Sequence, residues 1–457
     1  MNYNKINTGI VKQLIAICGS ENVLMDDEAR QDYSHDYTED LSFLPEIVVK
    51  PTNTNQVSEI LKLADKELIP VTPRGAGTGL SGGALPLNGG ILLSMERFNK
   101  IIEIDERNLQ ATVEPGVINQ VFRDAVEAKG LFYPPDPASR GSCFLGGNVA
   151  YNSGGPKAVK YGVTKDYVLN CEVVLPQGEI IWTGANVLKN STGYNLTQLM
   201  VGSEGTLGII TKIVFKLIPL PKHDLLMLVP FYSAEKACMA VSAVFRAGIT
   251  PSAMEFMERD AIAYTMQYVD AKIPLKDGIA AHLIIEVDGN DKDILMKDCE
   301  AISEIMYAHE CDEVHFAESA QEKANLWKLR KSTGEAVKSH SIYKEEDTVV
   351  PRAELPQLLS GVKSIGSKYG FKSVCYGHAG DGNLHVNIIR ENMSDEDWKH
   401  KIPLGIKEIF QLCKSLGGTI SGEHGIGYVQ KDYLGIVFNS TQIELQKQMS
   451  ASHHVES

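Results

Sequence analysis

Apolar residues in the first half of the chain follow two different spacings. Helical spacing predicts a helix within residues 8–30 and another over residues 55–67, where Thr54 or Asn55 can serve as the N-cap. Short apolar runs rich in β-branched residues predict strands, because such side chains pack well on a pleated surface. These strands are expected at residues 47–49, 69–71, 91–95, 101–104 and 110–113, with a further helix near 117–129.

The second half has longer helical stretches and sparser strands, and this change begins at residues 219–222. Strands are expected near residues 225–231, 281–287, 312–316 and 373–377, and helices near 233–247, 257–268, 291–308 and 354–369. The alternation favours an antiparallel sheet covered by helices. The pattern predicts an α+β protein with a helical segment (1–45), a glycine-rich domain (46–220) and a second domain (221–457).

A glycine-rich stretch at residues 73–86, PRGAGTGLSGGALP, stands between two expected strands. Glycines let the backbone approach a ligand closely, so that successive N–H groups can converge on an anion. The stretch contains the pattern G-x-G-x-x-G, but Gly83 and Pro86 prevent the helix that a Rossmann loop must open. It predicts a strand–loop–strand cradle for a phosphate or pyrophosphate, with an ordinary glycine-rich connection as the plain alternative.

Two further blocks of small residues follow at residues 134–155 and 200–211. Their amides and carbonyls can satisfy the heteroatoms of a flat ring system. The second block is therefore expected to form loops that wrap such a ligand. Three blocks so close together are difficult to explain as turns alone.

Charge and cysteine content restrict the class of partner for these 457 residues. A formal net charge of −14 argues against nucleic acid or an anionic membrane as the main partner, since both attract basic proteins. The eight cysteines include no C-x-x-C pair, which excludes a local zinc-ribbon or iron–sulfur signature. Neither a signal peptide nor a transmembrane segment is recognisable, so we expect a cytoplasmic protein, and peripheral attachment at the inner face of a membrane is compatible with this.

One strand of the second half combines an imidazole with an amide. In the extended run after Gly382, His385 and Asn387 lie two residues apart and therefore share a face. The glycines before this run can bring His378 to the same space. The plain alternative for each histidine is a structural hydrogen bond.

The loop at residues 421–427, SGEHGIG, places Glu423 beside His424 on a flexible backbone. Two histidines and a glutamate form a credible set for a divalent metal with open positions. The remaining histidine would then move a proton.

Two basic residues are candidate partners for an anionic substrate. Arg330 sits on an expected helix beside aromatic and apolar residues, and it could clamp a carboxylate through two parallel hydrogen bonds. A surface arginine is the plain alternative. Lys344 carries less signal, because the run Lys-Glu-Glu-Asp at residues 344–347 is typical of a solvated turn.

The segments PRGAGTGLSGGALP, GGNVAYNSGGPKAVKYG, GSEGTLGIIT, GHAGDGNLHVNI and SGEHGIG together resemble the flavin-linked 2-hydroxy-acid dehydrogenases of the vanillyl-alcohol-oxidase-type FAD superfamily. The resemblance runs from about residue 45 to 438 and is nearest to D-lactate dehydrogenase, the glycolate oxidase FAD subunit and D-2-hydroxyglutarate dehydrogenase. It implies an α+β fold, with a two-part FAD-binding domain of vanillyl-alcohol-oxidase type at residues 46–220. An antiparallel-sheet-plus-helices domain for substrate and metal follows at residues 221–457.

The resemblance also implies roles for individual residues. FAD would bind non-covalently, because Thr78 and Gly79 stand where some relatives carry a tethering histidine. The implied cofactor-binding residues are Arg74, Gly75, Ala76, Gly77, Thr78, Gly79, Ser142, Gly146, Asn148, Gly155, Gly205 and Ile210. The implied metal ligands, for zinc or alternatively manganese or iron, are His378, His385 and Glu423. The implied substrate-handling residues are Arg330, Asn387 and His424, with Lys344 a less certain match.

The reaction implied by the resemblance is oxidation of a small D-2-hydroxy acid (D-lactate, glycolate or D-2-hydroxyglutarate) to the 2-oxo acid. The metal would hold the substrate carboxylate and hydroxyl, and Arg330 would fix the carboxylate. His424 would take the hydroxyl proton while hydride passes from Cα to the flavin. A quinone, an electron-transfer flavoprotein or an iron–sulfur subunit would accept the electrons, and a homodimer is compatible with the sequence.

One segment departs from the family pattern. Relatives usually continue with a stretch resembling D-P-x-x-I-L-N-P-G-K, which residues 450–457, with His453 and His454, do not match. The C-terminal tail is therefore expected to be truncated or divergent, which bears on the completeness of the substrate pocket. Two other classes stay open: a non-catalytic flavin-binding subunit with an empty metal site, and a flavin-free metallohydrolase that uses the same three metal ligands.

Overall fold

The chain divides into two units in the computed structural model, which describes residues 3–271, 273 and 275–451. Unit 1 comprises Met1–Ser153, Val163–Leu220 and Glu423–Ser457, and unit 2 comprises Gly154–Gly162 and Pro221–Gly422. His453 and His454 lie outside the described residues. None of the described helices is both long and apolar enough to cross a membrane.

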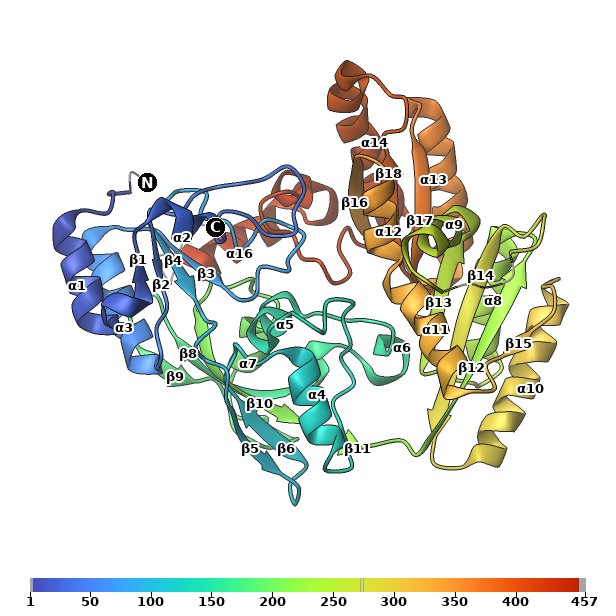
Figure 1. The fold of residues 1–457 in the computed structure, drawn as a ribbon, viewed down its shortest axis with the longest axis horizontal. Coiled ribbons are helices and arrows are strands. Elements are labelled where there is room, and N and C mark those ends of the chain that lie inside the picture. The colour runs from blue at the N-terminus through green and yellow to red at the C-terminus, as the bar shows by residue number, and fades with distance from the viewer. Residues whose placement is uncertain (1–2, 272, 274, 452–457) are drawn as a thin grey trace. The chain divides into compact units, whose positions relative to one another are not determined.

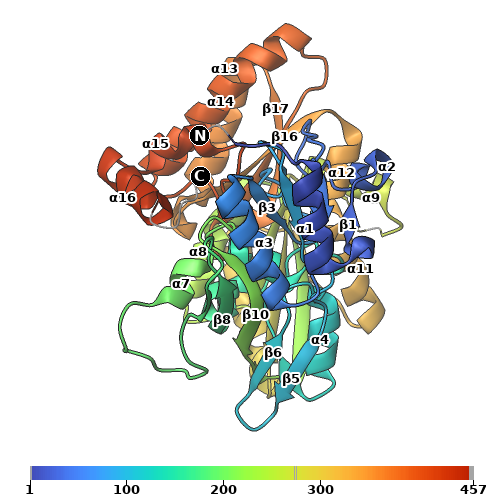
Figure 2. The same cartoon turned by 90° about the vertical axis from the view of Figure 1, so that its left-hand side faces the viewer.

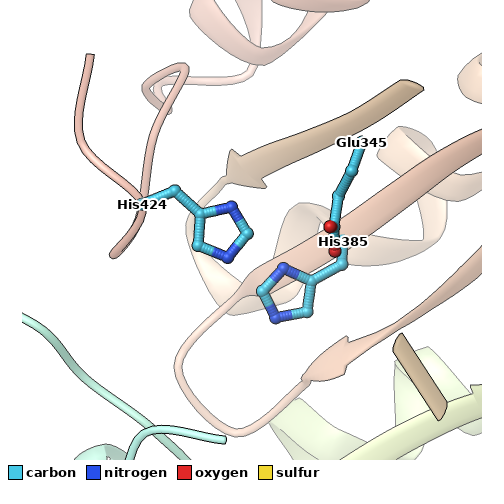
Figure 3. Close-up of side chains that lie close together, drawn as sticks. All are labelled: Glu345, His385 and His424. Atoms are coloured by element: carbon cyan, nitrogen blue, oxygen red, sulfur yellow. The ribbon is translucent and has the colours of Figure 1, made fainter. Parts of the chain in front are cut away.

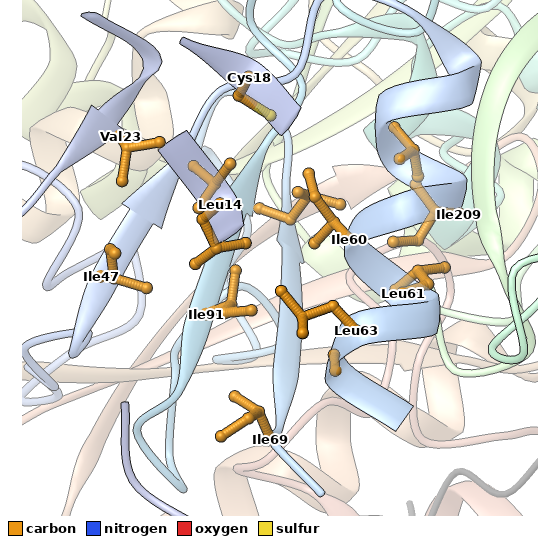
Figure 4. Close-up of a cluster of buried hydrophobic side chains, with 14 of the residues drawn as sticks. Leu14, Cys18, Val23, Ile47, Ile60, Leu61, Leu63, Ile69, Ile91 and Ile209 are labelled. Carbon is orange, nitrogen blue, oxygen red and sulfur yellow. The ribbon is translucent and has the colours of Figure 1, made fainter. Parts of the chain in front are cut away.

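The first sheet of unit 1 has the strand order β1-β2-β4-β3. Three strands are parallel, and β1 (Val23–Leu24) joins them antiparallel: β2 (Ile47–Val49), β4 (Ile91–Ser94) and β3 (Val71–Arg74). Helices α1 (Thr8–Cys18) and α3 (Thr54–Glu67) lie side by side on it (Figures 1 and 2). Their apolar faces meet the strands in a buried cluster that includes Leu14, Ile60 and Ile91 (Figure 4).

Two helix boundaries in this layer differ from the predictions. The helix expected within residues 8–30 ends at Cys18, because Gly19 adopts a φ of +85°, and β1 and the short α2 (Asp27–Gln31) follow it. The N-cap of α3 is Asn53 rather than Thr54 or Asn55, since the Asn53 side chain accepts a hydrogen bond from the Gln56 N–H. The strand–loop–strand arrangement of the first glycine block is confirmed by β3 and β4.

The second sheet of unit 1 is antiparallel, with the order β5-β6-β10-β8-β9. Its strands are β5 (Ile101–Asp105), β6 (Gln110–Val113), β10 (Ile209–Lys216), β8 (Val168–Val174) and β9 (Ile180–Trp182). The other elements of unit 1 are α4 (Asn119–Glu127), β7 (Leu131–Phe132), α5 (Leu145–Tyr151), α7 (Leu196–Met200), β11 (Ile218–Pro219), α15 (Leu434–Val437) and α16 (Ser440–Ala451). The expectation that the second glycine block forms loops throughout is wrong at α5, which ends where Asn152 turns left-handed.

Unit 2 is built on a seven-stranded antiparallel sheet of order β15-β12-β14-β13-β17-β18-β16, which confirms the predicted sheet class. Its strands are β12 (His223–Phe231), β13 (Ala253–Glu258), β14 (Ala281–Gly289), β15 (His315–Phe316), β16 (Tyr343–Val349), β17 (Lys372–His378) and β18 (Asn383–Ile389). The prediction missed β13, so the helix expected from residue 257 begins only at Arg259.

Helices cover both faces of this sheet (Figure 1). One face packs against α8 (Ala234–Arg246), α10 (Lys292–Ala308), α13 (Leu355–Tyr369) and α14 (Asp395–Ser415). The other packs against α6 (Ala158–Tyr161), α9 (Arg259–Tyr268), α11 (Ala320–Lys331) and α12 (Thr333–His340). Every candidate site residue of unit 2 except Gly155 therefore lies on the sheet or on a covering helix.

Candidate functional site

A cavity in unit 1 is lined by residues from all three glycine-rich blocks and encloses about 650 Å³ of empty space, part of it open to solvent. Gly75, Gly146 and Gly205 contribute one lining residue from each block. Side chains that would fill the space are absent at these positions, so the backbone itself forms much of the wall.

Arg74 supplies a buried positive charge to this cavity. Its Nη2 donates to the carbonyl oxygen of His35 at 2.7 Å, whereas Nη1 is buried with no hydrogen-bond partner among the described residues. Burial lowers the pKa of Arg74 from its usual value. Gly77, with a φ of +73°, makes room for the guanidinium, because a Cβ at that position would collide with it. A buried cationic donor that lacks a partner suits an anionic group of a cofactor.

The structure distributes the predicted cofactor residues unevenly. Arg74, Gly75, Gly146, Gly205 and Ile210 line the cavity. Other predicted residues belong to unit 1 without being part of the lining, namely Ala76, Gly77, Thr78, Gly79, Ser142 and Asn148. Gly155 belongs to unit 2.

Two further lining residues, Tyr151 and Glu204, were not singled out by the sequence. Both lie inside the glycine-rich blocks, where attention went to the small residues. Burial raises the pKa of the Tyr151 phenol well above its usual value, and the nearby Glu204 carboxylate adds to the effect.

The loop that carries Glu423 and His424 belongs to unit 1 and is tied to its glycine-rich blocks. Ser81 Oγ donates to the carbonyl oxygen of His424 at 3.1 Å. The Glu204 carboxylate accepts hydrogen bonds from the backbone N–H groups of Ile426 and Gly427, at 2.8 and 2.7 Å. The backbone around His424 is therefore held by residues that lie far away in the sequence.

In unit 2, one face of the sheet carries an unusual number of polar side chains. Residues that are directly opposite in adjacent antiparallel strands point to the same face. Tyr376 pairs with His385, Asp347 also pairs with His385, and Glu345 pairs with Asn387. The prediction that His385 and Asn387 share a face of one strand is confirmed by the register of β18. Buried polar groups this numerous require mutual compensation.

Glu255, from β13, forms ion pairs with two of the predicted site residues, His378 and Arg330. Its carboxylate is fully buried and lies 2.9 Å from His378 Nδ1 and 2.7 Å from Arg330 Nη2. Burial alone would raise the pKa of this carboxyl, but the opposing charges of His378 and Arg330 hold it below its usual value. Arg330, at the end of α11, is thus a buried residue rather than a surface one.

Asp347, from β16, plays the same part beside His385. The carboxylate is fully buried, with Oδ1 3.5 Å from His385 Nδ1 and 2.7 Å from the Asn383 side-chain amide. Its Oδ2 accepts hydrogen bonds from Ser421 Oγ and the Gly422 N–H. His378 and His385 are neighbours, with ring centroids 5.4 Å apart and planes at 82°. His378 therefore has a carboxylate hydrogen-bonded at Nδ1, which is the outer arrangement typical of metal-binding histidines, and Asp347 lies near the Nδ1 atom of His385. Glu423, the third predicted ligand, belongs to unit 1, so the complete set stays a prediction.

Glu345, Tyr376 and Asn387 complete the polar face. Tyr376 donates to Glu345 Oε1 at 3.0 Å, and the carboxylate lies beside His385 (Figure 3). Burial and the neighbouring Glu345 charge raise the pKa of Tyr376 far above its usual value. Asn387 is fully buried, and its side-chain amide interacts with the Tyr376 phenol. An amide has more than one donor and acceptor position, so Asn387 can also bind a ligand.

Lys344 lies on the opposite face of β16, because its register partner is Ile388 rather than Asn387. The reading of residues 344–347 as a solvated turn is wrong: they form a strand in which Glu346 and Asp347 are buried. The polar face near Asn387 is supplied by Glu345 instead.

Both halves of the chain match known protein families. Residues 45–184 match the family model described as FAD binding domain, and residues 220–452 match the one described as FAD linked oxidases, C-terminal domain. The chain is 39% identical to glycolate oxidase subunit GlcD of Bacillus subtilis, covering 98% of this chain and 94% of the relative. The chain belongs to the FAD-linked oxidases. Two other members of the family are D-lactate dehydrogenase of Anaerostipes hadrus (36% identical; 97% and 94% covered) and D-2-hydroxyglutarate dehydrogenase of Stutzerimonas stutzeri (31%; 97% and 96%).

The fold of this FAD-linked oxidase is also found in solved structures. A p-cresol methylhydroxylase structure superposes with a TM-score of 0.80 at 18% identity, covering 98% of this chain and 95% of the other. A 4-ethylphenol oxidase from Gulosibacter chungangensis gives 0.77 at 19% identity, with 99% and 95% covered. These likenesses confirm the predicted α+β fold. The protein is an FAD-dependent oxidoreductase, as the family resemblance of its sequence implied.

Proposed function

We propose that this enzyme oxidises a small D-2-hydroxy acid to the corresponding 2-oxo acid. The observation that carries the proposal is the buried polar face of unit 2, where Arg330, Asn387 and two histidines gather on one side of a sheet. A carboxylate and an adjacent hydroxyl need such a cationic donor and such an amide. The substrates named for the relatives, glycolate, D-lactate and D-2-hydroxyglutarate, share this chemistry.

Each residue has a proposed role derived from its surroundings. Arg330 would bind the substrate carboxylate, and Glu255 would orient the guanidinium through its ion pair with Nη2. Asn387 would bind the substrate through its buried amide, which lies on the same face of the sheet as His385. His424 would take the proton of the α-hydroxyl. Arg74 and the other lining residues of the unit 1 cavity would hold FAD non-covalently, and the bound FAD would supply the acceptor for the hydride from Cα.

We propose that His378 and His385 bind a divalent metal together with Glu423. The Glu255 carboxylate at His378 Nδ1 would orient that ring and leave its Nε2 as the ligand atom, and the Asp347 carboxylate lies 3.5 Å from His385 Nδ1. Two imidazoles and one carboxylate suit zinc, with manganese or iron as alternatives. Such an ion would supply Lewis-acid polarisation of the α-hydroxyl. The acceptor of the electrons (a quinone, an electron-transfer flavoprotein or an iron–sulfur subunit), a homodimeric assembly and a cytoplasmic location stay predictions.

The proposed function is tested by an anaerobic absorbance spectrum of the purified protein before and after addition of substrate. We expect a flavin band that bleaches with D-lactate, glycolate or D-2-hydroxyglutarate and does not bleach with L-lactate. A chelator should slow the bleaching without releasing the flavin. A flavin band that no 2-hydroxy acid bleaches would contradict the proposal and favour a non-catalytic flavin-binding subunit.

A further inference from the structure

Glu204 sits where the third glycine block turns from α7 into β10. Its backbone adopts a φ of +52°, between Gly202 and Gly205, which also have positive φ. The side chain is mostly buried and lines the cofactor cavity. The family resemblance assigned the cofactor to this block but gave Glu204 no role.

Both oxygens of the Glu204 carboxylate accept hydrogen bonds from the loop that carries His424. Oε1 accepts from Ile426 N and Oε2 accepts from Gly427 N, so each oxygen has its own backbone donor. Hydrogen bonds to a charged acceptor are about twice as strong as neutral ones. Burial raises the pKa of Glu204 and the two N–H groups oppose that rise.

The same loop is held from a second direction by the first glycine block. Ser81 donates through Oγ to the carbonyl oxygen of His424, and its own carbonyl accepts from Tyr428 N at 2.8 Å. Gly425 fits beneath, because a Cβ there would collide with the Tyr151 ring and lie 2.8 Å from Glu204 Oε1. The backbone from His424 to Tyr428 is thereby fixed within unit 1, which contains the cofactor cavity.

We propose that Glu204 is a positioning residue, which clamps the backbone after His424 to the wall of the cofactor cavity and so sets where the His424 imidazole takes the substrate proton. The inference rests on the proposed function, because it gives Glu204 a role only if His424 acts as the base. Proton transfer requires the base to be within hydrogen-bond reach, and a displacement of about 1 Å can cost about 100-fold in rate. In Glu204→Gln, one of the two backbone donors would face an NH₂ group and lose its acceptor.

The test compares Glu204→Gln with Glu172→Gln, a matched change of a second buried glutamate of unit 1. Glu172 accepts from Thr54 and Thr211 and pairs with Lys212, away from the 423–430 loop. FAD content, the limiting rate of anaerobic flavin reduction and the substrate Kd are measured for each. We expect Glu204→Gln to keep its FAD and to change the Kd less than about 3-fold, while the limiting rate falls about 10- to 100-fold. Glu172→Gln should match the wild type in all three.

Two outcomes would overturn the inference: a limiting rate for Glu204→Gln within about 2-fold of the wild type, or a rate loss that merely follows FAD loss.

Ser81→Ala provides a second test of the inference if Glu204→Gln folds poorly. It removes one hydrogen bond to the His424 carbonyl, worth about 1 kcal/mol, and should slow reduction about 5-fold. An unchanged rate in Ser81→Ala would count against the clamp. A wild-type flavin that no 2-hydroxy acid reduces would instead refute the proposed function itself.

Discussion

The two units make polar sites by opposite means. The cavity of unit 1 is lined largely by glycines and other small residues, among which Arg74, Tyr151 and Glu204 supply polar side chains. The polar face of unit 2 is built from charged and amide side chains that are buried and compensate one another, as Glu255 does for Arg330 and His378. The first design depends on space being kept open, and the second depends on charges being kept in balance. The units should therefore fail in different ways when single residues change.

The largest effect is expected from removing a charge in unit 2. Glu255→Ala leaves Arg330 buried without its carboxylate, which typically costs about 3–5 kcal/mol of the free energy of unfolding. Urea denaturation followed by fluorescence measures this loss. The double variant Glu255→Met with Arg330→Met removes both charges and should recover much of the stability while remaining inactive. A double variant as unstable as Glu255→Ala would show that the packing at this place, rather than charge balance, is what matters.

A smaller effect with a different signature is expected in unit 1. Gly146 and Gly147 are adjacent in α5 and both line the cavity, yet a Cβ on Gly146 would collide with Pro115 and a Cβ on Gly147 would meet nothing within 4 Å. Gly146→Ala should therefore lower the stability of the apoprotein by about 1–3 kcal/mol through overpacking. Gly147→Ala should raise it by about 0.5–1 kcal/mol, because alanine favours the helix.

Thermal melting of the FAD-free protein separates these two glycines, and titration with FAD then measures cofactor affinity. Weakened FAD binding in a stable Gly147→Ala would show that this glycine keeps space for the cofactor. Equal melting temperatures for both variants would contradict the steric account of the cavity wall.

The smallest expected effect sharpens the assignment of the two faces of β16. Glu345→Gln removes the charge partner of Lys338, whose Nζ lies 3.2 Å from Glu345 Oε2, and should cost about 1.5 kcal/mol. The neighbouring variant Lys344→Met changes the opposite face and should cost less than about 1 kcal/mol while leaving flavin reduction within about 2-fold. A strong loss of activity in Lys344→Met would restore this lysine to the substrate site.

The cavity of unit 1 was largely predictable from the sequence, because most of its lining residues come from three continuous glycine-rich blocks. The strands that flank the first block, and its failure to begin a helix, also follow from local residues such as Pro86. The anchoring of the His424 loop does not, since Ser81 and Glu204 meet it across more than two hundred positions. Only the folded chain shows that connection.

In unit 2 the site residues of β18 could be predicted from the sequence, but the residues of β13 and β16 that interact with the site could not. His385 and Asn387 share a face by simple alternation, whereas Glu255 comes from a strand that the prediction missed altogether. Asp347 was hidden in a run of charges that resembles a turn, because burial of adjacent acids becomes acceptable only when Asn383, Ser421 and Gly422 supply donors. Strand register, which no local pattern fixes, decided that Glu345 and not Lys344 faces Asn387.

The order of the segments along the chain has a consequence for the biosynthesis of this protein. Unit 1 draws on Glu423–Ser457 as well as on the first 153 residues, and unit 2 includes Gly154–Gly162, which Lys160 fastens to Asp288. Most of unit 1 therefore leaves the ribosome long before the loop with His424 is synthesised. That loop is the one to which Ser81 and Glu204 are hydrogen-bonded in the folded protein. During that interval two glycine-rich blocks have open acceptors and donors for a segment not yet translated, so a nascent chain halted before residue 423 should be the species most dependent on chaperones.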